Sequence, residues 1–297
     1  NIADLKSSLR QLHKAIPSDW LQHPQILAVL GKAYGRLEMY PQALAAYETA
    51  LQSQYSEYPL SLLEDKAGLQ TAWALAWAQQ RLPEDELPNF ELADKPLSLL
   101  DSGLKLLKLL EHLGNSQRRL EEEAKLWKRR AMLTQGADRR TDLEAMQRSY
   151  QQAHEFALQS YNQVAPYPLV NWLTIQVLRA MRNEAPYPER AQLKYWSEQA
   201  KTVIEQTERN DANFKSGINL AEYALLQYLS GSRLEEPLQV RQIVNAYQLA
   251  LSRGAAPRQI SYIQEHLGFL RLMLSDSQAA EIQPILQALT MIQMKLG

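Results

Sequence analysis

The side chains that could perform acid–base or metal chemistry are few in this chain and lie far apart. Its five histidines are His13, His23, His112, His154 and His266. None of them stands at the spacing of a metal site or of a catalytic histidine motif. There are no cysteines, which excludes disulfides, thiolate metal ligands and cysteine nucleophiles. A glycine-rich phosphate loop and a nucleophile elbow are also missing, so we expect no enzymatic activity, no metal and no cofactor.

The densest group of charged side chains is a basic stretch between residues 118 and 140. Its cations are Arg118, Arg119, Lys125, Lys128, Arg129, Arg130, Arg139 and Arg140. Three glutamates at 121–123 lie inside it and allow i to i+4 ion pairs such as Glu121–Lys125. A nucleic-acid site would combine such a stretch with accessible aromatic rings and little acid, and the chain as a whole is balanced, with 32 basic against 33 acidic residues. We interpret the stretch as a solvated helix face, keep an acidic peptide or phosphate ligand as the alternative, and expect no nucleic-acid partner.

Tryptophans form the second group that could hold a ligand. Trp73 and Trp77 lie one helical turn apart on one face, and Trp127 has a similar position in a later repeat. Their positions coincide with those that fill the core between packed helices. We therefore expect core filling, and keep a small-ligand pocket among the irregular central repeats as the alternative.

The elements that must position these residues are helices. Apolar residues recur with helical spacing through nearly the whole chain, prolines fall mostly between the periodic segments, and strand-like runs rich in Val, Ile and Thr are missing. We expect an all-α fold with a leading helix over residues 2–16, followed by about six antiparallel helix pairs. The pairs are expected at about residues 24–51, 60–113, 116–164, 167–207, 212–252 and 257–296.

The pair at residues 24–51 carries the most specific pattern. Small and large residues alternate in its two helices at Leu30, Gly31, Tyr34, Ala43, Tyr47 and Ala50. Closely packed helices need small residues where their axes approach and large ones to fill the neighbouring spaces. This pattern resembles the tetratricopeptide repeat, and the resemblance implies a superhelical α-solenoid. In the last pair we expect Gly268 to mark the same close approach.

A second resemblance lies in the C-terminal part of the chain. The segments 128–131 (Lys-Arg-Arg-Ala), 167–171 (Tyr-Pro-Leu-Val-Asn) and 216–221 (Ser-Gly-Ile-Asn-Leu-Ala) are similar to the divergent tetratricopeptide region of apoptosis-signal-regulating kinases and of bacterial signalling proteins. In the kinases that region is a regulatory interaction module beside the catalytic domain. The resemblance implies a regulatory scaffold, and because the chain begins at Asn1 without a methionine, we expect it to be a fragment of a larger signalling protein.

Polar residues on the first helix of each pair are the natural partner contacts, because these helices line the concave face of such a stack. Lys32 and Arg36 meet this condition in the first pair, and Asn171 and Asn219 in the fourth and fifth. For the asparagines, buried structural hydrogen bonding is the alternative. The sequence therefore predicts a protein–protein interaction scaffold or regulatory domain that binds a protein or peptide segment on the concave face.

The remaining expectations concern organisation and location. We expect residues 1–297 to form a single repeat domain with an irregular connector at 81–95, and Pro284 to kink or divide the last helix. No apolar run approaches the roughly 18 residues that span a bilayer, so we expect no membrane contact. The lack of cysteine fits a reducing compartment, and we expect a cytoplasmic protein. The terminal helices can either be capped or pair with a second copy to give a homo-oligomer.

Overall fold

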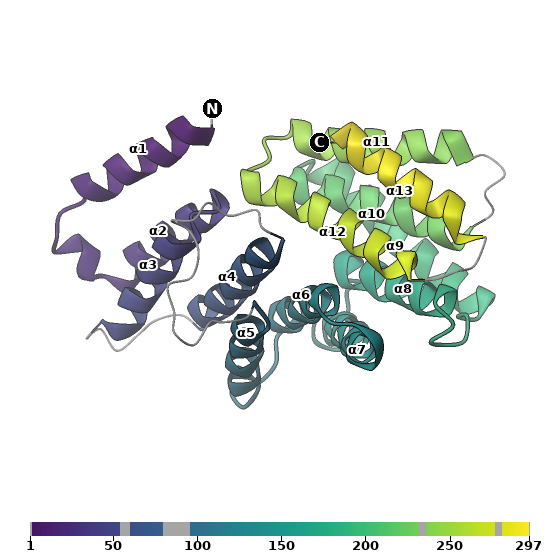
Figure 1. Ribbon diagram of the computed structural model, residues 1–297, viewed down its shortest axis with the longest axis horizontal. Helices are drawn as coiled ribbons and strands as arrows, with labels where there is room; N and C mark the ends of the chain where they lie inside the picture. Colours follow the sequence, from purple (N-terminus) through teal and green to yellow (C-terminus); the bar gives the residue numbers. More distant parts are fainter. Residues whose placement is uncertain (1, 54–59, 80–95, 232–235, 277–280, 297) are drawn as a thin grey trace. The chain divides into compact units, whose positions relative to one another are not determined.

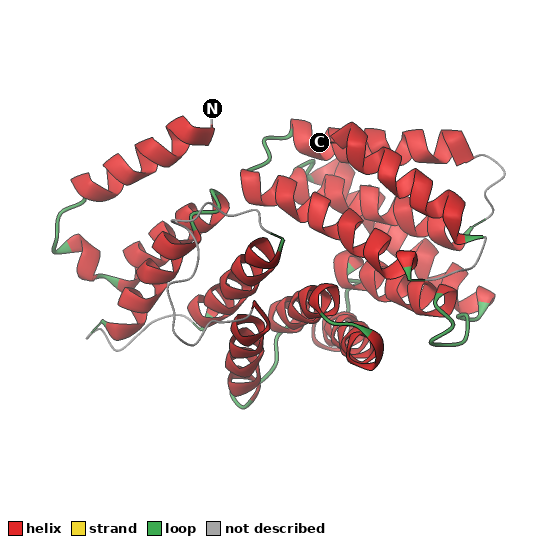
Figure 2. Ribbon diagram, in the orientation of Figure 1, coloured by secondary structure: helices red, strands yellow, loops and turns green. Residues whose placement is uncertain are grey.

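The computed structural model describes residues 2–53, 60–79, 96–231, 236–276 and 281–296. Within these ranges the chain forms α-helices, one short 3-10 helix at Trp20–Gln22 and no strand, which confirms the all-α expectation (Figures 1 and 2). The helices are α1 (Ile2–Ala15), α2 (Pro24–Arg36), α3 (Tyr40–Gln52), α4 (Ser61–Ala78), α5 (Pro96–Glu111), α6 (Gln117–Leu133), α7 (Gly136–Tyr161), α8 (Pro166–Met181), α9 (Arg190–Asn210), α10 (Phe214–Ser230), α11 (Glu236–Ser252), α12 (Pro257–Ser275) and α13 (Ile282–Leu296). The expected connector at 81–95 lies outside the described residues.

Local chemistry explains where these helices begin and end. Helices α2, α5, α8 and α12 each begin at a proline, whose missing N–H costs nothing in a first turn. The Ser116 hydroxyl caps α6 by accepting a hydrogen bond from the backbone N–H of Arg119 at 3.1 Å. Gly114 after α5 and Asn162 after α7 have positive φ angles of 98° and 51°, the left-handed conformation that often ends a helix.

Pro284 does not interrupt a helix, and the expected kink is wrong. Helix α13 begins at Ile282, so Pro284 lies in its first turn. Backbone N–H groups in a first turn have no intrahelical acceptor, and a proline there removes no hydrogen bond.

The chain divides into two compact units, whereas we expected a single domain. The first comprises Asn1–Asn115 with Ala256–Gln259, and the second comprises Ser116–Ala255 with Ile260–Gly297. In the first unit α2 packs on α3 and α4 on α5; in the second, α6 packs on α7, α8 on α9 and α10 on α11. Helix α8 also packs on α10, and α13 packs on α11. This packing of consecutive helices is consistent with a helical stack. None of the described helices is long and apolar enough to cross a membrane.

Glycines mark the closest approaches between paired helices. A Cβ atom at Gly31 would lie only 2.4 Å from Cε1 of Tyr47, so the ring of Tyr47 on α3 occupies the space that the glycine of α2 leaves free. Gly217 allows a similar close approach between α10 and α11, because a Cβ there would lie 2.9 Å from the Cβ of Ala250. At Gly268 a Cβ would meet nothing within 4 Å, so the close approach expected there is wrong.

The close approach at Gly31 can be tested against Gly268, which also lies in a helix. We expect Gly31→Ala to lower the free energy of unfolding by about 1–3 kcal/mol, because the new methyl group collides with the ring of Tyr47. Gly268→Ala should be neutral or stabilise by up to about 1 kcal/mol, because alanine favours the helix and the space is open. Chemical denaturation followed by circular dichroism measures both. Equal effects of the two substitutions would contradict the packing described for α2 and α3.

Candidate functional site

The basic residues of α6 are largely buried in the second unit. Lys128 is 1% exposed, Arg119 and Arg129 are each 5% exposed, and only Arg118 lies open to solvent. Lys125 is partly buried, pairs with Glu122 at 2.8 Å, and holds its Nζ atom 5.4 Å from the centre of the Tyr167 ring. The interpretation of this stretch as a solvated helix face is therefore wrong for the buried cations. Lys128 and Arg129 are neighbours near the C-terminal end of α6, whereas Arg119 lies in its first turn.

Two of these cations share one buried carboxylate. Glu265 of α12 lies with Oε1 3.0 Å from Nζ of Lys128, and its Oε2 accepts a hydrogen bond from Nε of Arg129 at 3.2 Å. The same Lys128 ammonium lies 4.9 Å from the centre of the Tyr262 ring, which adds a cation–π contact. Helix α12 is thereby fixed to α6 by charge-assisted contacts away from water.

A second buried carboxylate completes what we call the inner cluster. The inner cluster consists of Lys128 and Arg129 of α6, Asn171 of α8, Glu222 of α10, and Tyr262 and Glu265 of α12. Glu222 accepts hydrogen bonds from Nδ2 of Asn171 at 3.0 Å and from the Tyr262 hydroxyl at 2.7 Å. The inner cluster thus joins four helices by polar contacts, and its two cations share the carboxylate of Glu265.

Burial and charge set the protonation of the groups around the inner cluster. Burial alone would raise the pKa of Glu265, but the neighbouring Arg129 and Lys128 lower it to about 2, so the carboxylate is ionised. Burial also lowers the pKa of Lys128, and Glu265 opposes that effect. For His266, burial lowers the pKa to about 4, against the opposing charge of Glu222, so its imidazole is neutral at neutral pH.

The four predicted partner contacts lie in different surroundings. Lys32 is half exposed and pairs with Asp65 at 3.2 Å, and Arg36 is exposed; both belong to α2 of the first unit. In the second unit Asn171 and Asn219 are 2% and 5% exposed, and Asn171 also donates to the backbone oxygen of Tyr167 at 3.0 Å. The structure thus brings Asn171 together with Lys128 and Arg129, and gives it the buried hydrogen bonding that was the alternative for the asparagines.

The tryptophans also have structural surroundings. Trp73 is 3% exposed and stacks on Tyr40 with ring centres 6.5 Å apart, so it fills the core of the first unit as expected. Trp77 is partly buried. Trp127 belongs to the second unit, where its Nε1 donates to Glu123 at 3.1 Å. None of the three lines either of the grooves described below.

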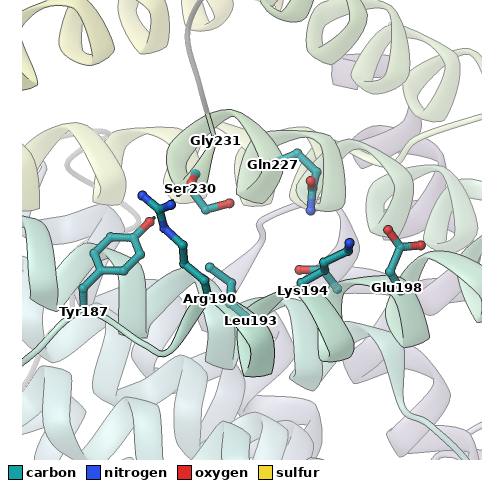
Figure 3. A pocket seen from close by; sticks show the side chains of 9 residues that line it. Tyr187, Arg190, Leu193, Lys194, Glu198, Gln227, Ser230 and Gly231 are labelled. Atoms are coloured by element: carbon teal, nitrogen blue, oxygen red, sulfur yellow. Dashed lines mark hydrogen bonds between the residues drawn. The ribbon is translucent and has the colours of Figure 1, made fainter.

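An open groove runs between α9 and α10 (Figure 3). We call it the α9–α10 groove; its volume is about 680 Å³, within the usual range of ligand sites. It is lined by Tyr187, Arg190, Leu193, Lys194, Ser197, Glu198, Gln227, Ser230 and Gly231. Leu193 and Ser197 are buried, whereas the ring of Tyr187 is 48% exposed. The groove therefore combines a partly apolar floor with a polar and aromatic rim.

Three charged side chains follow one another along the α9 wall. Arg190, Lys194 and Glu198 stand at four-residue intervals, and all three are exposed. Figure 3 shows Arg190 reaching from α9 towards the end of α10 at Ser230. None of the three forms an ion pair within the described part of the chain, which is also true of other exposed cations such as Lys201 and Lys215. Their charges remain available to a ligand.

The opposite wall offers polar groups at the end of α10. The Tyr187 hydroxyl donates to the backbone oxygen of Ser230 at 3.4 Å, which ties the loop before α9 to this end. A Cβ at Gly231 would lie 2.6 Å from the backbone oxygen of Gln227, so only glycine lets the chain leave α10 here. The side-chain amide of Gln227 can both donate and accept hydrogen bonds, as recognition of a peptide backbone requires.

Sequence reasoning did not single out these groove residues. The one local signal is that Arg190 and Lys194 are like charges at i and i+4, an arrangement that slightly destabilises an isolated helix and so invites an explanation. Among the described residues, no group of three or more His, Asp or Glu side chains could hold a metal ion.

No protein-family model, no curated protein and no solved structure matches the chain.

Proposed function

We propose that this chain is a protein–protein interaction scaffold, and that its second unit holds a polypeptide segment in the α9–α10 groove. The observation that carries the proposal is the row of three exposed charged side chains along an open groove, none of which forms an ion pair with another described residue. Because these charges line an open groove and none is neutralised by an ion pair with a described residue, they suit an external ligand of complementary charge.

The spacing of the row favours an extended segment. Four residues of α-helix rise about 6 Å along the axis, and side chains on one face of an extended strand repeat about every 6.6–6.8 Å. Alternate residues of an extended peptide can therefore follow successive turns of α9. A segment with the order acidic, x, acidic, x, basic would place carboxylates beside Arg190 and Lys194 and a cation beside Glu198.

A rigid groove wall supports tight binding. Helix α10 carries Glu222 of the inner cluster, whose hydrogen bonds from Asn171 and Tyr262 join α10 to α8 and α12. A wall fixed in this way loses little conformational freedom when a ligand binds, which lowers the entropy cost of association.

The proposal refines the expected concave-face site. In the second unit Lys128 and Asn171 already contact other helices of the chain and are buried, so a partner would have to displace side chains to reach them. In the first unit Lys32 and Arg36 remain proposed partner contacts, because both are accessible on α2. The resemblance to the regulatory region of signalling kinases supports a regulatory role for this binding of a polypeptide segment.

Charge reversal in the groove tests the proposal. Peptides are first selected from a displayed random library on the whole chain, and their affinity is then measured for the double variant Arg190→Glu/Lys194→Glu. We expect the affinity to fall about tenfold or more, because two attractive contacts become repulsive. The matched control is Lys201→Glu/Lys215→Glu, which makes the same charge change at exposed lysines outside the groove. Equal losses in both variants, or no selected peptide at all, would contradict the proposal.

A further inference from the structure

A second groove lies between α11 and α13, on other helices than the α9–α10 groove. We call it the α11–α13 groove; its volume is about 800 Å³. Helix α11 contributes Pro237, Val240, Arg241, Val244, Asn245 and Gln248 to its walls, and α13 contributes Pro284, Gln287, Ala288, Met291 and Lys295. On each helix these positions recur at three- and four-residue intervals, so each wall is one continuous helix face.

The floor of the α11–α13 groove is apolar and its rim is not. Val240, Val244 and Ala288 are 4%, 5% and 2% exposed and line the groove where α11 packs on α13. Met291 rises from this floor and is 42% exposed. Such a methionine is a flexible apolar surface that adapts to a bound side chain.

The charges around the α11–α13 groove have one sign. Arg241 stands on the α11 wall and Lys295 on the α13 wall; both are exposed, and neither forms an ion pair with another described residue. Among the described residues that line the groove, the other polar ones are Asn245, Gln248 and Gln287 with their amides, and none carries a carboxylate. A ligand with acidic residues on both flanks therefore matches the groove.

We infer that the α11–α13 groove binds an amphipathic α-helix of a partner protein, with an apolar stripe towards the floor and acidic residues on both sides of it. The space between two packed helices takes the ridge of side chains of a third helix, which is the way an amphipathic helix enters a hydrophobic groove. A second copy of this chain does not fit as the occupant, because a self-complementary contact through this face would bring its own Arg241 and Lys295 against each other.

The experiment uses the whole chain and a displayed library of helical peptides with randomised surface positions. Enriched peptides are expected to carry apolar residues at i, i+3, i+4 and i+7 with Asp or Glu beside them. Their affinity should fall about tenfold or more in Arg241→Glu/Lys295→Glu, and also in Met291→Glu, which puts a charge on the exposed part of the floor. Circular dichroism confirms that both variants remain folded.

The α9–α10 variant Arg190→Glu/Lys194→Glu separates this inference from the proposed function, since it should leave helix binding unchanged. Three results would overturn the inference: no enrichment of helical peptides, enriched peptides that bind the α11–α13 variants as well as the unchanged chain, or enrichment of basic helices. Sedimentation as a dimer that Met291→Glu dissociates would also overturn it, because the groove would then belong to a second copy.

Discussion

Replacing Glu265 by glutamine is expected to lower the free energy of unfolding by about 3–5 kcal/mol, the usual cost of leaving a buried charge without its partner. The substitution keeps the shape of the side chain, but it removes the carboxylate that pairs with the buried Lys128 and Arg129. Urea denaturation followed by circular dichroism measures the loss. Glu205→Gln removes a glutamate whose side chain is 46% exposed, and is expected to change stability by no more than about 0.5 kcal/mol.

A double variant separates charge imbalance from a simple loss of packing. Lys128→Met combined with Glu265→Gln removes one cation together with the carboxylate that it pairs with, so the net charge of the inner cluster is the same as in the unchanged chain. We expect the double variant to be clearly more stable than the sum of the two single effects predicts. Additive effects of the two substitutions would show that Lys128 and Glu265 do not stabilise each other. They would contradict the pairing described for the inner cluster.

Acid is expected to destabilise the second unit through His266. The histidine is 3% exposed, and burial lowers its pKa to about 4, against 6.5 in the unfolded chain. Its neighbours are Glu222 of α10 and Lys128 of α6, together with Glu265 of its own helix. Between these two pKa values the unfolded chain binds a proton that the folded chain does not. The free energy of unfolding is therefore unaffected by the protonation of His266 above pH 6.5, and it falls as the pH drops from 6.5 towards 4.

Between pH 7 and pH 5 this linkage amounts to about 2 kcal/mol. The free energy of unfolding should fall by that much more in the unchanged chain than in His266→Gln, which cannot take up the proton. Parallel urea titrations at the two pH values give the difference, and the contribution of the buried His154 cancels because both proteins contain it. An identical pH dependence of the two proteins would mean that His266 is not held neutral by its surroundings.

The helices themselves could be predicted from the sequence, because their signals are local. Prolines at 24, 96, 166 and 257 begin helices, Ser116 caps one, and Gly114 ends another. Each of these residues acts through its own backbone and the next few residues, so periodicity and punctuation suffice. Close contacts between helices were harder to predict than the helices themselves. Gly31 faces Tyr47, as the alternation of small and large residues predicts, whereas no described residue outside its own helix lies close to Gly268, because the neighbours of a helix depend on distant parts of the chain.

The inner cluster could not be predicted, since its partners are far apart in sequence. Glu265 lies 136 residues after Arg129, and no local pattern connects them. The glutamates at 121–123 even suggested a solvated face for the same helix. The α9–α10 groove could not be predicted from the sequence for a related reason. Arg190, Lys194 and Glu198 look like any exposed helix face, and what distinguishes them is that they line an open groove, which only the structure reveals.

Exchanging charges between the chain and its ligand tests the α9–α10 groove most directly. A selected peptide is made again with its acidic residues replaced by lysine, and the dissociation constants of both peptides are measured for the unchanged chain and for Arg190→Glu/Lys194→Glu. If the peptide lies along α9, the variant should prefer the basic peptide and the unchanged chain the acidic one, each by about tenfold or more. If both proteins prefer the acidic peptide, the segment is held elsewhere, and the function proposed for the α9–α10 groove is wrong.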